Sequence, residues 1–510
     1  MTDFTLPEID YAAIGPLVVL FGAACLGVLV EALVPRRLRH PLQLGLALVA
    51  VVVAFILVVR LAGLGLVTAG GSVTIDRPAL FMQGTLMVFG FVALLVIGDR
   101  AVDRQGAFVA QPAIAVGSEA DRRQLEAPGS TEVFPLTLFS LGGMALFVSA
   151  SDLLTMFIAL EVLSLPLYLM CALARRRRLL SQEAAVKYFL LGAYASSFFL
   201  FGVALIYGFA GTVDFAGIHD AIAASMMDRL LVVAGLALVV MGLLFKAAAA
   251  PFHVWTPDVY QGAPTPVVAF MAAATKVAAF GALLRVLYVA FERITWDWQP
   301  VLGVIAVLTM MLGAILAVTQ TDIKRLLAYS WIANAGYVLV AFVAPGQVGT
   351  AATMFYLVAY GFAVLGAFAI VTLVRDADGG ETPHLSRWAG LGRQSPVVAG
   401  VFTLVMLALA GIPLTAGFTA KFAVFSAALS AGHVWLVIAG VLSSLIIAFP
   451  YLRVVVMMWL SEPGESTATL EVPGSLTAAA LAVAAIATVA LGVVPGPLLD
   501  LVSEAAIFVR

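Results

Sequence analysis

The chain has 510 residues, of which 63% are hydrophobic and 11% are charged. A soluble domain of this length cannot bury so much apolar surface, so we expect the chain to lie in a lipid bilayer. Its formal net charge of −2 excludes a large basic surface and argues against nucleic acid as a partner. The two cysteines, Cys25 and Cys171, lie far apart in or beside apolar stretches, so neither a disulfide framework nor a metal site is expected.

Apolar runs follow one another along almost the whole chain. A transmembrane helix needs about 20 apolar residues. The runs that reach or approach this length predict an all-α polytopic membrane protein of about 14 spans, at residues 12–34, 41–65, 78–98, 133–150, 153–174, 184–210, 230–261, 264–291, 300–320, 324–344, 350–374, 396–430, 433–460 and 473–496. The charged segment 99–132 is expected to be a loop on the cytoplasmic side.

Two of these runs, 230–261 and 396–430, are too long to be single unbroken helices. Each would exceed ~45 Å at ~1.5 Å per residue, and each contains an internal proline, Pro251 or Pro413. Proline removes a backbone donor and clashes with the preceding turn. We therefore expect the seventh and the twelfth helices to be broken inside the membrane.

The spacing of the two prolines hints at an internal duplication. They are 162 residues apart, and a shift by the same number moves the fifth span onto the tenth. The spacing predicts two five-helix repeats, at 133–291 and 300–460, which an odd number of spans places upside down relative to each other. Three helices and a loop (1–132) and a last helix (461–510) would flank the repeats.

Arginine and lysine are distributed unequally between the two sets of connections. Alternate loops carry 16 of these residues, whereas the other loops and the two termini carry 5. Because positive charge marks the cytoplasmic side, both termini are expected to face away from the cytoplasm.

The lysines are segregated from the arginines. Most arginines fall in loops, but four of the five lysines fall within apolar spans, namely Lys187, Lys246, Lys276 and Lys421. A lysine at the bilayer centre costs ~2.5–3.5 kcal/mol, yet unlike arginine it can release its proton when its charge loses solvation. These four residues are therefore candidates for carrying protons, and the fifth, Lys324, is expected to be an ordinary cytoplasmic anchor.

Glu161 and His253 are the candidate partners of these lysines. Glu161 lies near the middle of the fifth span, where a nearby lysine would decide its charge state. His253 lies at the break of the seventh span and could relay protons between Lys246 and Lys276, because imidazole titrates near neutrality. Three other interpretations stay open: a static ion pair that fixes helix packing, a lysine that snorkels to the interface (most of all Lys187), and a purely structural histidine.

Five motifs carry a resemblance to a known family. They are FKAAAAPFHVWTPDVYQGAPTPVVAFMAAATK, ALEVLSLPLYLM, EAAVKYFLLGAYASSFFLFG, TDIKRLLAYSWIANAGYVLVAF and GIPLTAGFTAKF. The first resembles the proton-channel core of the antiporter-like membrane subunits of complex I. Its part HVWTPDVYQGAPTPV is similar to subunit N of bacterial NADH–quinone oxidoreductase, rather than to the L or M relatives or the Na+/H+ antiporters.

The resemblance implies a role for each candidate residue. The acid–lysine pair of the fifth and seventh helices would be Glu161 and Lys246, the central lysine Lys276, the lysine of the broken twelfth helix Lys421, the input-side lysine Lys187, and the relay His253.

The resemblance also implies a proton-translocating, non-redox subunit of NADH:quinone oxidoreductase in the bacterial inner membrane. No cofactor is expected on this chain, while NADH, FMN, Fe–S clusters and quinone would be used by other subunits. The expected neighbours are lipids, M-type and K-type subunits, and a lateral helix of an L-type subunit. A cation/proton antiporter, a structural membrane scaffold and a subunit of a related hydrogenase-type complex remain alternatives.

Overall fold

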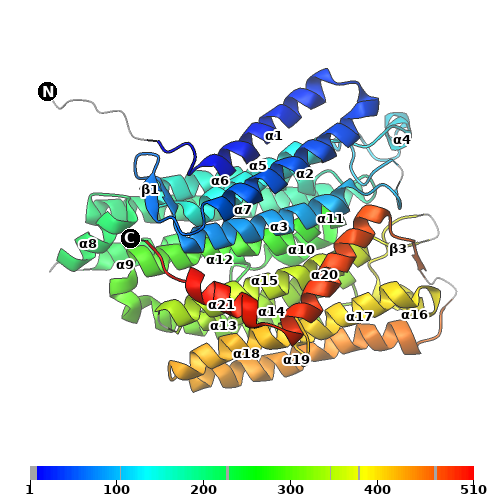
Figure 1. Cartoon of the computed structure of the whole chain (residues 1–510). Helices are drawn as coiled ribbons and strands as arrows, with labels where there is room; N and C mark the ends of the chain where they lie inside the picture. Colours follow the sequence, from blue (N-terminus) through cyan, green and yellow to red (C-terminus); the bar gives the residue numbers. More distant parts are fainter. Residues whose placement is uncertain are drawn as a thin grey trace.

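The computed structural model describes residues 9–103, 105–224, 229–344, 346–376, 379–464 and 468–509. Its long helices lie side by side in one bundle (Figure 1). The first half contains α1 (Gly15–Leu33), α2 (Arg36–Arg60), α3 (Arg77–Gly98), α5 (Val133–Ser149), α6 (Leu153–Cys171), α7 (Arg178–Ala210), α9 (Leu230–Ala247), α10 (Trp255–Gly262), α11 (Thr265–Phe270), the π-helix η1 (Met271–Thr275), α12 (Lys276–Arg285) and the π-helix η2 (Val286–Ala290).

The second half is built in the same way. It contains α13 (Thr295–Val318), α14 (Ile323–Ala341), α15 (Gly346–Val371), α17 (Pro396–Ala410), α18 (Ala416–Ser430), α19 (Val434–Leu460), α20 (Ser475–Val493) and α21 (Gly496–Ala505). The minor elements are α4 (Glu119–Glu126), α8 (Phe215–Ala224), α16 (Leu391–Gln394), the 3-10 turns η3 (Glu292–Ile294) and η4 (Leu385–Trp388), and the strands β1 (Leu66–Thr68), β2 (Val73–Ile75), β3 (Val374–Arg375) and β4 (Thr469–Leu470). The strands form two antiparallel pairs, β1 with β2 and β3 with β4.

The all-α polytopic class is confirmed. In the part of the chain that the structure describes, 11 helices are long and apolar enough to span a membrane, and α5, α17 and α18 are shorter apolar helices. The 19-residue α14 is not among the 11; its first turn carries Lys324 and Arg325. The expected number of 14 spans therefore stays a prediction.

Both expected helix breaks are confirmed. The seventh span divides into α9 and α10 at Ala248, which has a left-handed φ of 57°, and the twelfth divides into α17 and α18 at Gly411, with φ of 85°. Backbone carbonyls and amides freed by a break need new partners. The Trp255 indole donates to the carbonyl of Phe245 at 3.0 Å, and the Ala250 amide donates to the Thr309 hydroxyl at 3.0 Å.

Local geometry repeats between the two halves at an offset of 170 residues. Asp152 caps α6 and Asp322 caps α14, and each forms an isolated bridge with a residue 62 positions further on. Gly143 lies against the backbone of Leu163, just as Gly313 lies against Ala333. Counting each broken helix once, α13 is the fifth span after α5, so equivalent helices run in opposite directions. These equivalences agree with two inverted repeats; their boundaries remain predictions.

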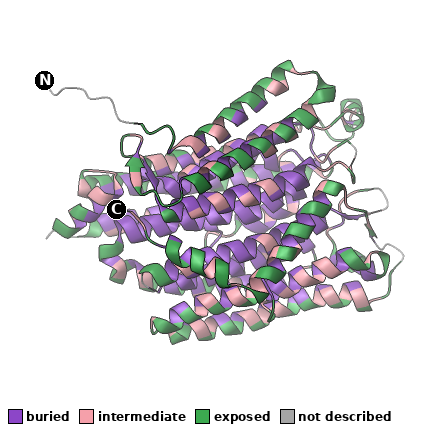
Figure 2. Cartoon of the chain, in the orientation of Figure 1, coloured by how far each residue is buried: buried purple, intermediate pink, exposed green. Residues whose placement is uncertain are grey.

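Burial decreases from the middle of the bundle outwards (Figure 2). In the most apolar stretch of the 265–290 helix, every residue is buried, whereas in that of α20 only 28% of the residues are buried. The central helix packs against α3, α5, α9 and α15. Leucine and valine side chains on outer helices such as α2 and α19 are exposed, as expected for surfaces that face lipid or other subunits.

Candidate functional site

Lys246, in the last turn of α9, is buried among aromatic rings. Its Nζ lies 5.1 Å from the centre of the Tyr168 ring and 5.0 Å from that of Tyr188. The ammonium also donates a 3.4 Å hydrogen bond to the Tyr168 hydroxyl, and only 3% of the residue is exposed. Ring faces attract a cation but replace its lost water only in part. The surroundings therefore suit an amine that can be neutral as well as charged.

Glu161 lies on α6, seven residues before Tyr168 and so on the same face of that helix. Its Oε1 is buried without a hydrogen-bond partner, and its charge acts on Lys246 through space. Among the described residues, no ion pair within 4.0 Å joins Glu161 to Lys246. The structure thus brings the expected acid and lysine to one region but holds them apart.

Lys276 occupies the centre of the bundle, directly after the π-helical turn η1. Its Nζ donates a 2.9 Å hydrogen bond to the Trp331 carbonyl of α14. It also lies 4.4 Å from the centre of the Trp331 ring and 4.1 Å from that of Tyr360 on α15. The residue is 1% exposed, so snorkelling to an interface is excluded for this lysine. π-Helical turns are rare and occur often at functional sites.

Lys421 binds the broken end of the neighbouring helix. From α18, its Nζ donates to the Ala410 carbonyl at 2.9 Å and to the Leu409 carbonyl at 3.3 Å, both at the end of α17. It also donates to the Ser444 hydroxyl at 2.8 Å and lies 4.9 Å from the Tyr337 ring centre. The expected contact between this lysine and the carbonyls freed by the break is therefore present.

A small cavity connects the surroundings of the last two lysines. Tyr360, which contacts Lys276, and Lys421 itself both line it, together with Asn334 and Tyr356. About 10 Å³ is open to the centre of a water molecule, which is room for roughly one water. The Tyr360 hydroxyl is buried and has no hydrogen-bond partner in the described structure, so a water there would satisfy it.

Hydroxyl and amide groups extend along α14 between the two lysines. Chains of such groups allow protons to move between buried sites when water completes them. The contacts are Asn334 to the Ser330 carbonyl at 2.7 Å, Tyr337 to Ser443 at 3.0 Å, Tyr356 to Asn334, and Ser330 with Tyr451.

The other two candidates lie in different surroundings. His253 belongs to the 248–254 break, and its Nδ1 is buried without a partner. Lys187 has a side chain that is 41% exposed and forms ion pairs with Glu183 and Asp258, both at 2.7 Å. Asp258 in turn binds Arg325 at 2.7 Å. The structure therefore places Lys187 in a surface ion network, apart from the buried lysines.

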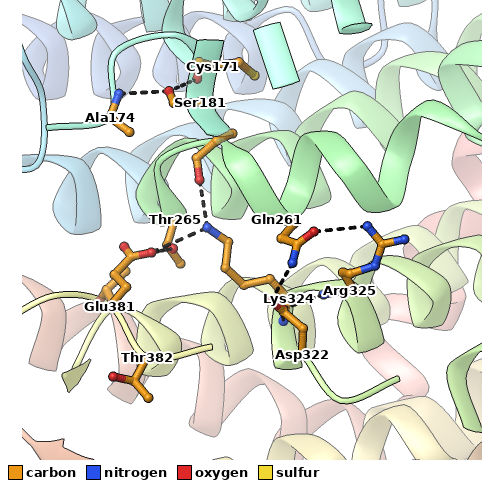
Figure 3. A network of polar contacts seen from close by, with 12 residues as sticks. Cys171, Ala174, Ser181, Gln261, Thr265, Asp322, Lys324, Arg325, Glu381 and Thr382 are labelled. Atoms are coloured by element: carbon orange, nitrogen blue, oxygen red, sulfur yellow. Dashed lines mark hydrogen bonds and ion pairs between the residues drawn. The ribbon is translucent and has the colours of Figure 1, made fainter. Parts of the chain in front are cut away.

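Lys324 is also buried, which its place in the sequence did not indicate. The expectation of an ordinary cytoplasmic anchor is wrong, because the residue is only 1% exposed. Its Nζ donates to the Ala263 carbonyl at 2.8 Å and lies 3.5 Å from Oε2 of Glu381, which also accepts a 2.6 Å hydrogen bond from Thr265 (Figure 3). The loop that carries Glu381 covers the start of α14. No pattern in the sequence near Lys324 predicts that a distant loop buries it.

Glu381 lies in that loop, outside the spans, and its charge state is set by its neighbours. Burial disfavours the ionised carboxylate, but Lys324 and Arg375 overcome this effect, and the pKa of Glu381 lies below its ordinary value of 4.5. Glu381 is therefore ionised at neutral pH and links α11 to α14.

Comparisons with known proteins show which family the chain belongs to. The family described as "NADH:quinone oxidoreductase/Mrp antiporter, TM" matches residues 150–447. NADH-quinone oxidoreductase subunit N of Salinispora arenicola is 66% identical, over 100% of both chains. The chain belongs to the subunit N family. The resemblance carried by the motifs of the broken seventh helix is therefore confirmed.

Solved structures of other membrane complexes contain chains with this fold. A chain of respiratory complex I from Thermus thermophilus with bound aureothin is 31% identical, with a TM-score of 0.78, over 96% of this chain and 99% of that one. A chain of the Mrp complex from Dietzia sp. DQ12-45-1b has a TM-score of 0.82 at 21% identity, over 98% and 97%. The second likeness concerns the fold alone.

Proposed function

We propose that this chain carries protons across the bacterial inner membrane as a non-redox subunit of NADH:quinone oxidoreductase. One observation carries the proposal: Lys246, Lys276 and Lys421 are each at most 5% exposed, and in the described structure none of them has a carboxylate within ion-pair distance. A lysine kept for packing would be paired, because burying an unpaired charge is costly. A lysine that alternates between charged and neutral forms fits such a site.

The proposed pathway follows the groups that the fold brings together. Protons would pass from Lys246 through His253 and water to Lys276, and through the cavity beside Tyr360 to Lys421. Movement of Glu161 towards or away from Lys246 would change the proton affinity of that lysine. At low effective dielectric, a shift of a few ångströms changes the Coulomb energy by several kcal/mol.

The energy for this transport would come from redox chemistry in other subunits. NADH, FMN, Fe–S clusters and quinone would be bound there. M-type and K-type subunits and a lateral helix of an L-type subunit would cover part of the exposed apolar surface, and lipid would cover the rest. Both termini would lie outside the cytoplasm, as the distribution of arginine and lysine indicates.

Replacement of Lys246 tests the proposal directly. In the assembled complex, Lys246→Ala and Lys246→Arg are both expected to lower NADH-driven proton pumping by about tenfold or more, because neither side chain can take up and release a proton. Pumping would be followed with a pH-sensitive dye in proteoliposomes. Arg37→Ala, which changes an exposed arginine at the start of α2, is the control. Full pumping in the Lys246 variants would refute the role.

A cation/proton antiporter is the second candidate, because the family description also names Mrp antiporters. That function predicts Na+-dependent proton exchange in proteoliposomes without NADH. Its absence, together with NADH-dependent pumping, would favour the first candidate.

A further inference from the structure

A pocket lies where several helices end, outside the pathway described above. It is bounded by the start of α7, the junction of α10 and α11, the start of α14 and the loop after α15, and about 40 Å³ is open to the centre of a water molecule. Five positively charged side chains line it: Arg175, Arg176, Arg177, Lys324 and Arg375.

The carboxylates in the pocket do not balance these charges. Glu381 and Asp103 are the two acidic residues of the lining, so a surplus of two positive charges is left even when Arg176, which has another interaction, is not counted. Glu381 already accepts a hydrogen bond from Thr265 and neighbours Lys324. Asp322 is close, but its carboxylate caps α14 and binds Gln261. Like charges confined in a small partly buried space repel one another strongly, so the pocket favours an anion.

Arg177 provides the clearest donor for that anion. Its backbone is left-handed, with φ of 60°, at the residue that precedes α7, and its Nη1 is buried without a hydrogen-bond partner. Its charge acts on both Lys324 and Glu381, so it is directed to this pocket. A buried guanidinium donor left unsatisfied costs free energy, and an anion oxygen would remove that cost.

Arg175 has a different part. Its guanidinium donates to the carbonyls of Gln105, Leu125 and Ala127, and these hydrogen bonds hold the 105–127 segment against the pocket. Arg175 therefore lines the pocket and adds positive charge to it, whereas Arg177, Lys324 and Arg375 are the residues that would contact the anion.

We infer that this pocket binds a phosphate group, supplied by the headgroup of an anionic phospholipid or by free phosphate. Guanidinium groups match the geometry of phosphate oxygens, and basic pockets between transmembrane helices bind anionic headgroups. The open volume equals that of roughly three waters, which suits one phosphate group and excludes a nucleotide. A bound phosphate would tie the loop after α15 to the junction of α10 and α11, next to the helix that carries Lys276.

The test uses the whole complex in nanodiscs and needs no turnover. One arm compares discs of phosphatidylcholine alone with discs that contain phosphatidylglycerol, and native mass spectrometry counts the retained anionic lipids. The other arm adds inorganic phosphate to phosphatidylcholine discs and measures the thermal unfolding temperature of the complex. The reference is the same sample in a sulfate-free chloride buffer of equal ionic strength.

Arg177→Gln is expected to weaken the binding of one phosphatidylglycerol, or of inorganic phosphate, by about tenfold or more. Arg177→Lys should recover part of it, because it restores the charge but not the planar fork. Arg37→Gln, which removes an exposed arginine of α2, should leave binding unchanged. A response to phosphatidylglycerol alone identifies a lipid headgroup, and a response to inorganic phosphate identifies free phosphate. Equal responses of the wild type and an assembled Arg177→Gln complex to both probes would overturn the inference, whatever the outcome for proton pumping.

Discussion

At the scale of single residues, each buried lysine has its own surroundings. Lys246 lies beside two tyrosine rings, Lys276 lies against a tryptophan and a tyrosine, and Lys421 binds carbonyls at the end of another helix. Aromatic faces and carbonyl oxygens stabilise an ammonium without becoming charged themselves. The proton can therefore leave Lys276 or Lys421 without leaving an unpaired anion beside it.

Lys421→Met separates this proposal from a structural scaffold. Methionine has a similar length and fills the same space, so assembly should persist, while proton pumping should fall by about tenfold or more because the titratable group is lost. Blue native electrophoresis would measure assembly, and a pH-sensitive dye would measure pumping. If the chain were only a structural scaffold, assembly and proton pumping would both survive the substitution.

At the scale of elements, the helix breaks position the site. The break after α17 depends on Gly411, whose left-handed φ of 85° suits glycine. A Cβ at this position would also lie 3.0 Å from Cδ and 3.2 Å from Nζ of Lys421. The same glycine therefore ends the helix and leaves space for the lysine.

Gly411→Ala is expected to destabilise the protein by about 1–2 kcal/mol and to displace the Lys421 side chain, with a loss of pumping. Gly400→Ala, in the same helix but with no atom within 4 Å of the new Cβ, is the matched control and should stabilise by about 0.5–1 kcal/mol. Thermal unfolding of the purified complex measures both. Equal effects at the two positions would contradict the argument.

Much of this architecture was predictable because lipid simplifies the sequence pattern. Apolar runs marked the helices, and Pro251 and Pro413 marked the breaks within them. The sequence also singled out Lys276 as a mid-helix charge. It could not show the aromatic surroundings of Lys246 or the distance to Glu161, because those contacts join helices whose relative rotation leaves no trace in the spacing of apolar residues. Lys324 was misjudged for a related reason, since a distant loop covers it.

At the scale of the whole molecule, Glu381 joins the two halves. It accepts a hydrogen bond from Thr265, in the first predicted repeat, and pairs with Lys324, in the second. Because it lies in the loop after α15, it holds three segments together at one end of the bundle. Its ionised form is the one that makes these contacts.

This link should weaken in acid. The pKa of Glu381 is lower in the folded protein than its ordinary value of 4.5, so its contribution to stability is full above that value and disappears as the pH falls through the folded pKa. Thermal unfolding of the complex as a function of pH would show it. Glu381→Gln should be less stable than the wild type at neutral pH, and the difference should shrink with acidification; a constant difference would contradict the assignment.

The five-residue turn η1, which ends next to Lys276, has a geometric consequence. A π-turn holds one more residue than an α-turn, and one residue corresponds to about 100° of rotation in an α-helix. If the extra residue moved past Lys276 to the next turn, the ammonium would swing by about that angle around the helix axis, away from Trp331 and Tyr360, while both ends of the helix stayed in place. The π-turn therefore offers the central lysine a rotation about the helix axis that does not require the ends of the helix to move.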